Sequence, residues 1–122
     1  MPTILIAEDN NLTRTTLAQF LRTEGYEVES AENGAQAVLL LNEKKFDLVI
    51  SDVVMPHLNG FGLLHRVNSL SPGTPVLLMT AYAPMQPRRA ETDGAAELML
   101  KPIQLSELLS KVRRLLERKQ SE

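Results

Sequence analysis

The sequence contains no cysteine, which excludes a disulfide framework, a thiolate nucleophile and a zinc site with cysteine ligands. It also lacks a marked excess of either charge, because 13 Lys and Arg residues stand against 15 Asp and Glu residues. The resulting net charge of -2 provides no broad positive field for nucleic acid or an anionic membrane. We therefore expect no direct contact with either.

Long hydrophobic runs are also absent. No apolar stretch approaches the roughly 20 residues that span a bilayer, and residues 1–6 have neither a basic leader nor a long apolar core. We expect a soluble, cytoplasmic protein. The 122 residues, 43% of them hydrophobic, suffice for one domain with a real core, so residues 1–122 are expected to form a single domain.

Short apolar segments predict strands that are buried on both faces, as in a parallel sheet covered by helices on each side. These segments are residues 3–7, 47–51, 76–79 and 98–100. Residues 26–30 instead alternate between apolar and charged side chains, which is typical of an edge strand.

Helical patterns separate these strands. The first helix is expected over about residues 12–22, with Gly25 placed to terminate it. Asn33 and Gly34 open a second helix, and Asn59 can cap a third that ends before Pro72. The last helix, over residues 105–116, places its leucines and valine on one stripe.

The segment 81–93 fits this pattern least well, because Pro84 and Pro87 interrupt it and few of its residues are apolar. We expect only a helix of about two turns there, from Pro87 to Gly94. Five alternating strand and helix units still predict an α/β fold, a right-handed doubly wound parallel sheet. Its functional crevice should lie at the carboxyl ends of the strands.

Acidic side chains follow two of the predicted strands. Glu8 and Asp9 come directly after the first strand and Asp52 comes after the third, so the three should converge on one rim of the sheet. Clustered carboxylates repel one another unless a cation is held there, and hard oxygen ligands favour Mg²⁺, or Mn²⁺, over zinc. Each acid taken alone is more simply explained as a helix cap.

Two further polar residues reach the same rim. Thr80 ends the fourth strand and Lys101 ends the fifth. A carboxylate, a metal ion and a lysine together make a site for an aspartyl phosphate, because fixed cations stabilise the transferring group. As isolated residues, Thr80 would be an ordinary strand end and Lys101 an ordinary solvated side chain.

The ordered placement of these elements resembles the receiver domains of two-component response regulators over essentially the whole chain. The matching elements are Glu8-Asp9, Asp52 with Met55-Pro56 and Leu58-Asn59-Gly60, Thr80-Ala81, and Lys101-Pro102. The resemblance implies a flavodoxin-like (βα)5 sheet with strand order 2-1-3-4-5. It also implies a phosphoacceptor signalling domain that is not an enzyme beyond catalysing its own phosphorylation and dephosphorylation.

The resemblance implies that Asp52 accepts a phosphoryl group from the phosphohistidine of a sensor histidine kinase or phosphotransfer protein. Asp9, Asp52 and the main-chain carbonyl of Val54 would coordinate Mg²⁺, with Glu8 acting largely through a bound water. The chain would then control a downstream protein or output domain, alone or as part of a longer regulator or hybrid kinase.

The same resemblance assigns the phosphoryl oxygens. Lys101 would pair with one of them, and the Thr80 hydroxyl and the Ala81 N-H would hold the others. A cis bond before Pro102 would aim Lys101 into the site. The response would appear on the face formed by the fourth helix, fifth strand and fifth helix, where an apolar strand also allows a homodimer.

Two features depart from the common receiver pattern: the residue at position 98 and the proline-bearing segment where the fourth helix belongs. Leu98 stands where many receivers have an aromatic ring that reports phosphorylation, so we expect the order of residues 83–93 to carry the response instead. Tyr82 is a candidate to compensate in part for the missing ring; the alternative is that its ring only packs over the mouth of the site. Val54 and Tyr82 lie two residues beyond Asp52 and Thr80, where the side chains of family members help or hinder the water that attacks the phosphoryl group. Neither side chain can readily position this water, which predicts slow autodephosphorylation.

Two other functions are consistent with part of this pattern. A phosphatase of the haloacid dehalogenase type needs a second acid two residues after its nucleophile, and this chain has Val54 there. A receiver-like scaffold that works without phosphorylation remains the alternative, although the acids, Asp52 and Lys101 are all present.

His57 and His65 lack partners at ligand spacing, and the basic residues of the last helix are interpreted as a solvated face.

Overall fold

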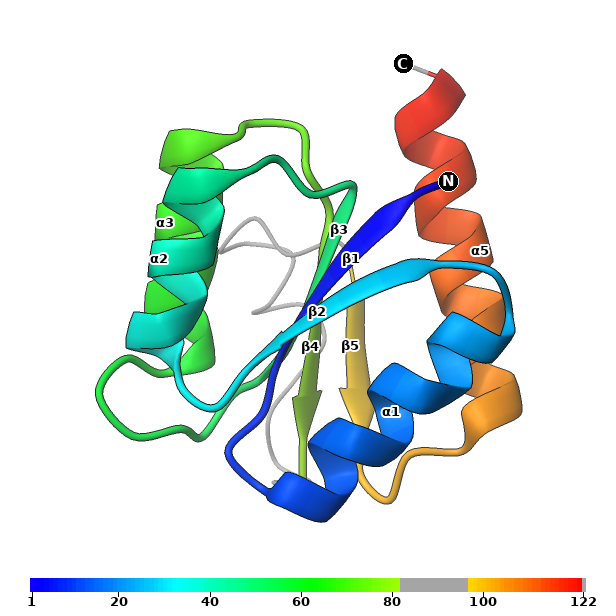
Figure 1. Ribbon diagram of the computed structural model, residues 1–122, viewed down its shortest axis with the longest axis horizontal. Helices are drawn as coiled ribbons and strands as arrows, with labels where there is room; N and C mark the ends of the chain where they lie inside the picture. The colour runs from blue at the N-terminus through cyan, green and yellow to red at the C-terminus, as the bar shows by residue number, and fades with distance from the viewer. Residues whose placement is uncertain (82–96, 122) are drawn as a thin grey trace.

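The computed structural model describes residues 1–81 and 97–121, with side chains up to Glu117. Its described residues form one parallel sheet in the order β2-β1-β3-β4-β5, flanked by four helices (Figure 1). The strands are β1 (Thr3–Ala7), β2 (Glu27–Ala31), β3 (Leu48–Asp52), β4 (Val76–Thr80) and β5 (Glu97–Leu100). The helices are α1 (Asn11–Thr23), α2 (Gly34–Glu43), α3 (Gly60–Leu70) and α5 (Leu105–Ser121).

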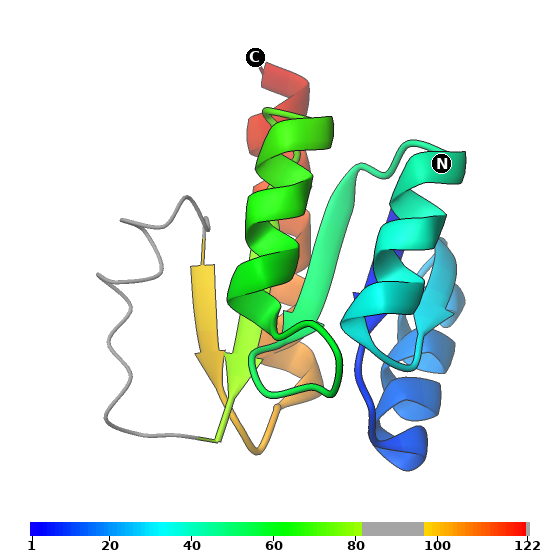
Figure 2. The same ribbon diagram turned by 90° about the vertical axis from the view of Figure 1, so that its left-hand side faces the viewer.

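The predicted doubly wound fold and its strand order are confirmed. Helices α2 and α3 cover one face of the sheet, and α1 and α5 cover the other (Figure 1). Figure 2 looks onto the first of these layers and shows α2 and α3 side by side. The chain leaves β1 toward β2 on one side and returns to β3 on the other, so the topological switch point lies between β1 and β3.

The core consists of two clusters, one on each face of the sheet. In β1, Ile4 and Ile6 pack in the cluster that includes residues of α1 and α5, while Leu5 and Ala7 pack in the cluster that includes residues of α2 and α3. This two-sided burial is the reason that β1, β3 and β4 appear as continuous apolar runs. The predicted stripe of α5 is also confirmed, because its members at positions 108, 112, 115 and 116 are buried.

The two edge strands differ in how well the sequence predicted them. The alternation predicted for β2 is confirmed, since Val28 is buried and Glu27 is exposed. The prediction that residues 98–100 are buried on both faces is wrong, because Met99 is buried but Leu100 is 52% exposed. As the last strand of the order 2-1-3-4-5, β5 forms the second edge of the sheet.

Asparagine side chains begin three of the helices. Asn10, Asn33 and Asn59 accept hydrogen bonds from Thr13 N, Gln36 N and Gly62 N at 2.9, 2.8 and 2.9 Å. The caps predicted at positions 33 and 59 are confirmed, whereas α1 begins at Asn11, one residue before the expected start. Gly25, with φ of 99°, ends α1 as predicted, because glycine adopts this conformation without steric cost.

The helix expected from Pro87 to Gly94 lies outside the described residues, as does Tyr82. Among the helices that are described, none combines the length and the apolar character needed to cross a membrane.

Candidate functional site

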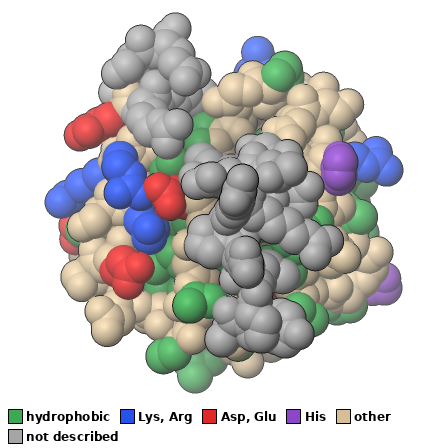
Figure 3. Space-filling model, turned by 180° about the vertical axis from the view of Figure 1, so that it is seen from behind, with side chains coloured by type: hydrophobic (Ala, Val, Ile, Leu, Met, Phe, Trp, Pro, Cys, Tyr) green, Lys and Arg blue, Asp and Glu red, His purple; other side chains and the backbone are tan. Residues whose placement is uncertain are grey.

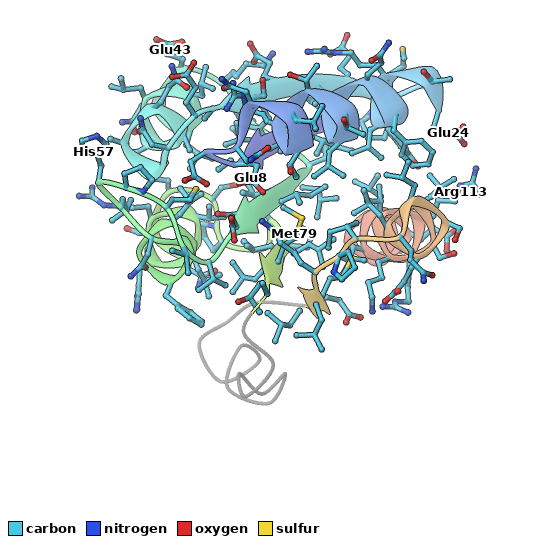
Figure 4. All side chains as sticks on the ribbon, turned by 90° about the horizontal axis from the view of Figure 1, so that it is seen from below. Glu8, Glu24, Glu43, His57, Met79 and Arg113 are labelled. Carbon is cyan, nitrogen blue, oxygen red and sulfur yellow. The ribbon has the colours of Figure 1, made fainter. Side chains whose placement is uncertain are left out.

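Three carboxylates gather at the carboxyl end of the sheet, at the switch point. Ala7 of β1 lies opposite Ser51 of β3 in the parallel register, so the residues that follow them come to the same rim. Carboxylate oxygens of Glu8, Asp9 and Asp52 lie within 4.8 Å of one another. Figure 4 looks onto this rim, with Glu8 near its centre. The predicted convergence of the acids is confirmed, with Asp52 as the last residue of its strand and not the first beyond it.

The three acids differ in their exposure to solvent. Glu8 is fully buried and Asp52 is 7% exposed, whereas Asp9 is exposed. The Glu8 carboxylate accepts a hydrogen bond from Asn10 N at 3.2 Å, and Oδ1 of Asp52 accepts one from Val54 N at 3.4 Å. Burial of two negative charges side by side requires a nearby positive charge.

Lys101 provides that charge from the next position after β5. Its main-chain N-H donates to the Thr80 carbonyl at 2.7 Å, and the bond to Pro102 is cis, as expected. Its Nζ donates to Oε1 of Glu8 at 2.8 Å and to Oδ2 of Asp52 at 2.9 Å. The ammonium thus bridges carboxylates from two different strands, and it is not the solvated side chain that its isolated position allowed.

Burial and pairing shift two pKa values at this rim. Burial raises the pKa of Glu8, although the hydrogen bonds from Lys101 and from Asn10 N oppose this. Burial lowers the pKa of Lys101, but its bonds to Glu8 and Asp52 outweigh that effect and raise the pKa above its ordinary value. Lys101 therefore remains a cation at neutral pH.

A pocket of about 320 Å³ opens beside the acids. Its lining residues are Asp52, Val54, Thr80, Ala81 and Lys101. Thr80 is buried, whereas Val54 is 71% exposed. Every residue that the sequence analysis named for the phosphoryl group thus lines one cavity, which is large enough to admit a tetrahedral anion.

The donor set of the acid cluster fits a hard cation. The described residues that could together hold a metal are the three acids, and carboxylate oxygens are the ligands that Mg²⁺ and Mn²⁺ prefer. His57 and His65 are both exposed, and neither belongs to this group of potential ligands.

The roles of two residues at the rim were not predicted from the sequence. Arg14 donates from Nη1 to the main-chain carbonyl of Glu8 at 2.9 Å. The signal in the sequence for this contact was an arginine one turn into the helix that follows the acid pair. Gly60 lies so close to β3 that a Cβ built on it would come within 2.6 Å of the Asp52 carbonyl oxygen. Gly60 belongs to the Leu58-Asn59-Gly60 motif, but its packing role depends on the tertiary structure.

Lys111 of α5 is less solvated than predicted, whereas the side chains of Arg113 and Arg114 are more than half exposed, as expected. Lys111 lies 3.5 Å from Glu97, Arg114 also pairs with Glu97, and Arg113 lies 3.5 Å from Glu24. Figure 3 shows acidic side chains interleaved with basic ones on this face. The described side chains therefore form mixed ion pairs between α5 and neighbouring elements, so the interpretation as a simply solvated face is wrong for Lys111, whose side chain is 19% exposed.

Comparison with known proteins identifies the family. Residues 4–113 match the response regulator receiver domain, and the chain belongs to this family. It is a receiver domain of two-component response regulators, a class of signalling domain.

Individual relatives and structures agree with this assignment. The chain is 32% identical over 117 residues to the probable transcriptional regulatory protein TcrX of Mycobacterium tuberculosis, covering 95% of this chain and 50% of that protein. It is 41% identical over 114 residues to the DNA-binding transcriptional regulator NtrC of a Bradyrhizobium species, covering 93% and 24%. The chain thus spans about half or a quarter of the length of these relatives.

A solved structure of the same fold is the chemotaxis response regulator CheY4 of Vibrio cholerae. It matches with a TM-score of 0.86 and 31% identity, covering 94% of this chain and 98% of that one. A CheY-like receiver domain from Methanospirillum hungatei matches with a TM-score of 0.93 and 28% identity, over 99% and 98% of the two chains. These neighbours have the flavodoxin-like order that the described strands form.

Proposed function

We propose that residues 1–122 form a single receiver domain in which Asp52 accepts a phosphoryl group from a histidine kinase or phosphotransfer protein. The observation that carries this proposal is the position of the Asp52 carboxylate. It lies 2.9 Å from the Lys101 ammonium, within an acid cluster, on a pocket that a phosphoryl group can enter. A structural ion pair alone would not require two further carboxylates at the same place.

The transfer needs a nucleophile and stabilisation of negative charge. An oxygen of Asp52 forms a bond to phosphorus while the phosphorus-nitrogen bond of the donor phosphohistidine breaks, and the imidazole leaves with that electron pair. Lys101 then exchanges its bond to Asp52 for one to a phosphoryl oxygen. Thr80 and the Ala81 N-H, which line the same pocket, hold the remaining oxygens.

Glu8, Asp9 and Asp52 are the side chains that would hold Mg²⁺, with the Val54 carbonyl as a further ligand. Bound there, the ion would neutralise the acids and the charge that develops on the transferring group. Mn²⁺ has the same preference for oxygen ligands. The support for this assignment is the all-oxygen donor set and the burial of two of its members.

The output is a partner protein or an output domain of the kind that the longer relatives carry. We infer that it responds to the face that includes β5 and α5. Leu98, at the usual aromatic position, is half-buried and packs against the cluster that contains Leu78, so the signal has to travel without a ring there. The expected contribution of residues 83–93 remains a prediction about a segment outside the described residues.

The test is phosphorylation by acetyl phosphate, followed by intact mass. Wild type with Mg²⁺ should gain one phosphoryl group, while Asp52→Asn, or wild type with EDTA, should gain none. Glu43→Gln, which removes an exposed acid at the end of α2, is the matched control and should behave as wild type. If wild type gains no adduct and fails to bind beryllofluoride, the phosphorylation-independent scaffold becomes the better explanation.

A further inference from the structure

Arg14 forms contacts at the acid cluster that the proposed function does not use. Its side chain is only 13% exposed, and Nη1 donates to the main-chain carbonyl of Glu8 at 2.9 Å. Nη2 donates to Oδ1 of Asn11 and lies 3.9 Å from Oε1 of Glu32. The guanidinium thus connects the end of β1, the first turn of α1 and the loop after β2.

We propose that Arg14 is a positioning residue for the metal site, holding the peptide between Glu8 and Asp9 in the orientation that brings both carboxylates to Asp52. This inference rests on the proposed function. The carbonyl that Arg14 binds belongs to the planar peptide that joins Glu8 and Asp9. The orientation of this peptide therefore sets the positions of both Cα atoms and the directions in which the two side chains leave the main chain. A hydrogen bond from a charged donor resists rotation of that peptide more strongly than one from a neutral donor.

Arg14 and Lys101 act on the acids in different ways. Lys101 occupies carboxylate oxygens of Glu8 and Asp52 directly, so it competes with a metal ion for them. Arg14 binds a main-chain oxygen and leaves the carboxylate oxygens of Glu8 and Asp9 available as ligands. Its positive charge still reduces the repulsion among the acids, and its bond can persist whether or not a cation is present.

The competing explanation is that Arg14 only fastens α1 to the sheet. Arg22 provides a matched control, because it lies on the same helix and Nη2 donates to the Val28 carbonyl of β2 at 2.8 Å. Both bonds are part-buried and both span six residues. Arg22 has the same kind of anchoring bond without contact to the acid cluster, so a purely structural role predicts the same behaviour for both arginines.

The experiment compares wild type with Arg14→Met, Arg14→Lys and Arg22→Met. Mg²⁺ affinity is measured from amide chemical shifts during titration, and the free energy of unfolding is measured by urea denaturation in EDTA. We expect Arg14→Met to weaken Mg²⁺ binding by about 10- to 100-fold, as found for residues that orient metal ligands. Arg14→Lys should fall between wild type and Arg14→Met, since it keeps the charge but loses the planar fork. Arg22→Met should lose stability without losing Mg²⁺ affinity.

The outcomes separate this inference from the proposed function. If wild type binds Mg²⁺, Asp9→Asn does not, and Arg14→Met binds as tightly as wild type, the inference is overturned and the proposed function stands. If wild type itself binds no Mg²⁺, both are overturned. Should Arg14→Met not fold, a wild-type Mg²⁺ affinity in Arg14→Lys would be sufficient to overturn the inference.

Discussion

Nζ of Lys101 lies 2.9 Å from Oδ2 of Asp52, and the two residues are 49 positions apart in the chain. The same nitrogen reaches Oε1 of Glu8 at 2.8 Å. One ammonium therefore compensates two buried carboxylates from neighbouring strands. The same ammonium is the proposed partner of a phosphoryl oxygen. Phosphorylation of Asp52 would therefore require Lys101 to exchange its bonds to the carboxylates for a bond to the phosphoryl group.

Lys101→Met should destabilise the domain as well as prevent efficient phosphorylation. The buried Glu8 carboxylate would lose its cation, and leaving a buried charged group without its partner costs more than about 1–3 kcal/mol. Urea denaturation near neutral pH without Mg²⁺ measures this loss. Lys111→Met is the control, because Lys111 pairs with the partly exposed Glu97 and should cost about 0–1 kcal/mol. Equal losses in the two variants would contradict the special role of the Lys101 pair.

Mg²⁺ should raise the thermal midpoint of wild type and have little effect on Asp9→Asn. Asp9 is the exposed member of the cluster, so its substitution removes a ligand with little effect on the core. A free ion concentration about 100-fold above the dissociation constant adds about 2.7 kcal/mol. Differential scanning calorimetry with Mg²⁺ and with EDTA measures the gain. A full gain in Asp9→Asn would exclude this acid as a ligand.

The free energy of unfolding of wild type, compared with that of Glu8→Gln at the same pH, should be lower at neutral pH than at mildly acidic pH. Burial raises the pKa of Glu8 above its ordinary 4.5, so the folded state binds this proton more tightly than the unfolded state. Stability from this group is therefore gained as pH falls through the raised pKa and lost as pH rises. Urea denaturation in EDTA from about pH 4.5 to about pH 7 measures the difference. If wild type instead gains on the variant as pH rises, pairing with Lys101 dominates over burial.

Gly60→Ala should be destabilising, whereas Gly62→Ala should be nearly neutral. A Cβ at Gly60 would lie 2.6 Å from the Asp52 carbonyl oxygen and 2.8 Å from the Val53 Cα, both backbone atoms. Such overpacking costs about 1–3 kcal/mol. A Cβ at Gly62 would meet the mobile end of the Leu58 side chain, and alanine adds about 1 kcal/mol of helix propensity. Thermal denaturation compares the two, and a stable Gly60→Ala would contradict the close approach of α3 to β3.

The phosphorylated domain should lose its phosphoryl group slowly, and Val54→Asn should shorten its lifetime. Val54 lines the pocket and is 71% exposed, but its side chain cannot hydrogen-bond a water. An amide at this place can orient a water toward the phosphorus. Intact mass over time after removal of acetyl phosphate measures the lifetime. Val54→Leu is the apolar control, and rapid loss in wild type would refute the prediction.

Local patterns in the sequence were sufficient to predict much of this protein. Most residues of β1, β3 and β4 are buried and apolar, apart from polar residues at the carboxyl ends of β3 and β4. Short apolar runs were therefore sufficient to predict these strands. The asparagine caps and Gly25 satisfy helix ends within a few residues, which keeps that information local. The placement of Glu8, Asp9, Asp52 and Thr80 at strand ends then predicted one shared rim, because parallel strands end on the same side.

The tertiary structure decided the contacts between residues far apart in the chain. Strand composition does not reveal that β5 forms an edge on which Leu100 is half-exposed, because exposure depends on which strands are neighbours. The bridge from Lys101 to Glu8 joins residues 93 positions apart, and it depends on strand order, register and side-chain direction together. The contacts of Arg14 with the Glu8 carbonyl and of Gly60 with β3 likewise exist only once helix and strand are packed. The sequence by itself thus determined the elements and the chemical groups at the rim, whereas packing determined which of those groups touch.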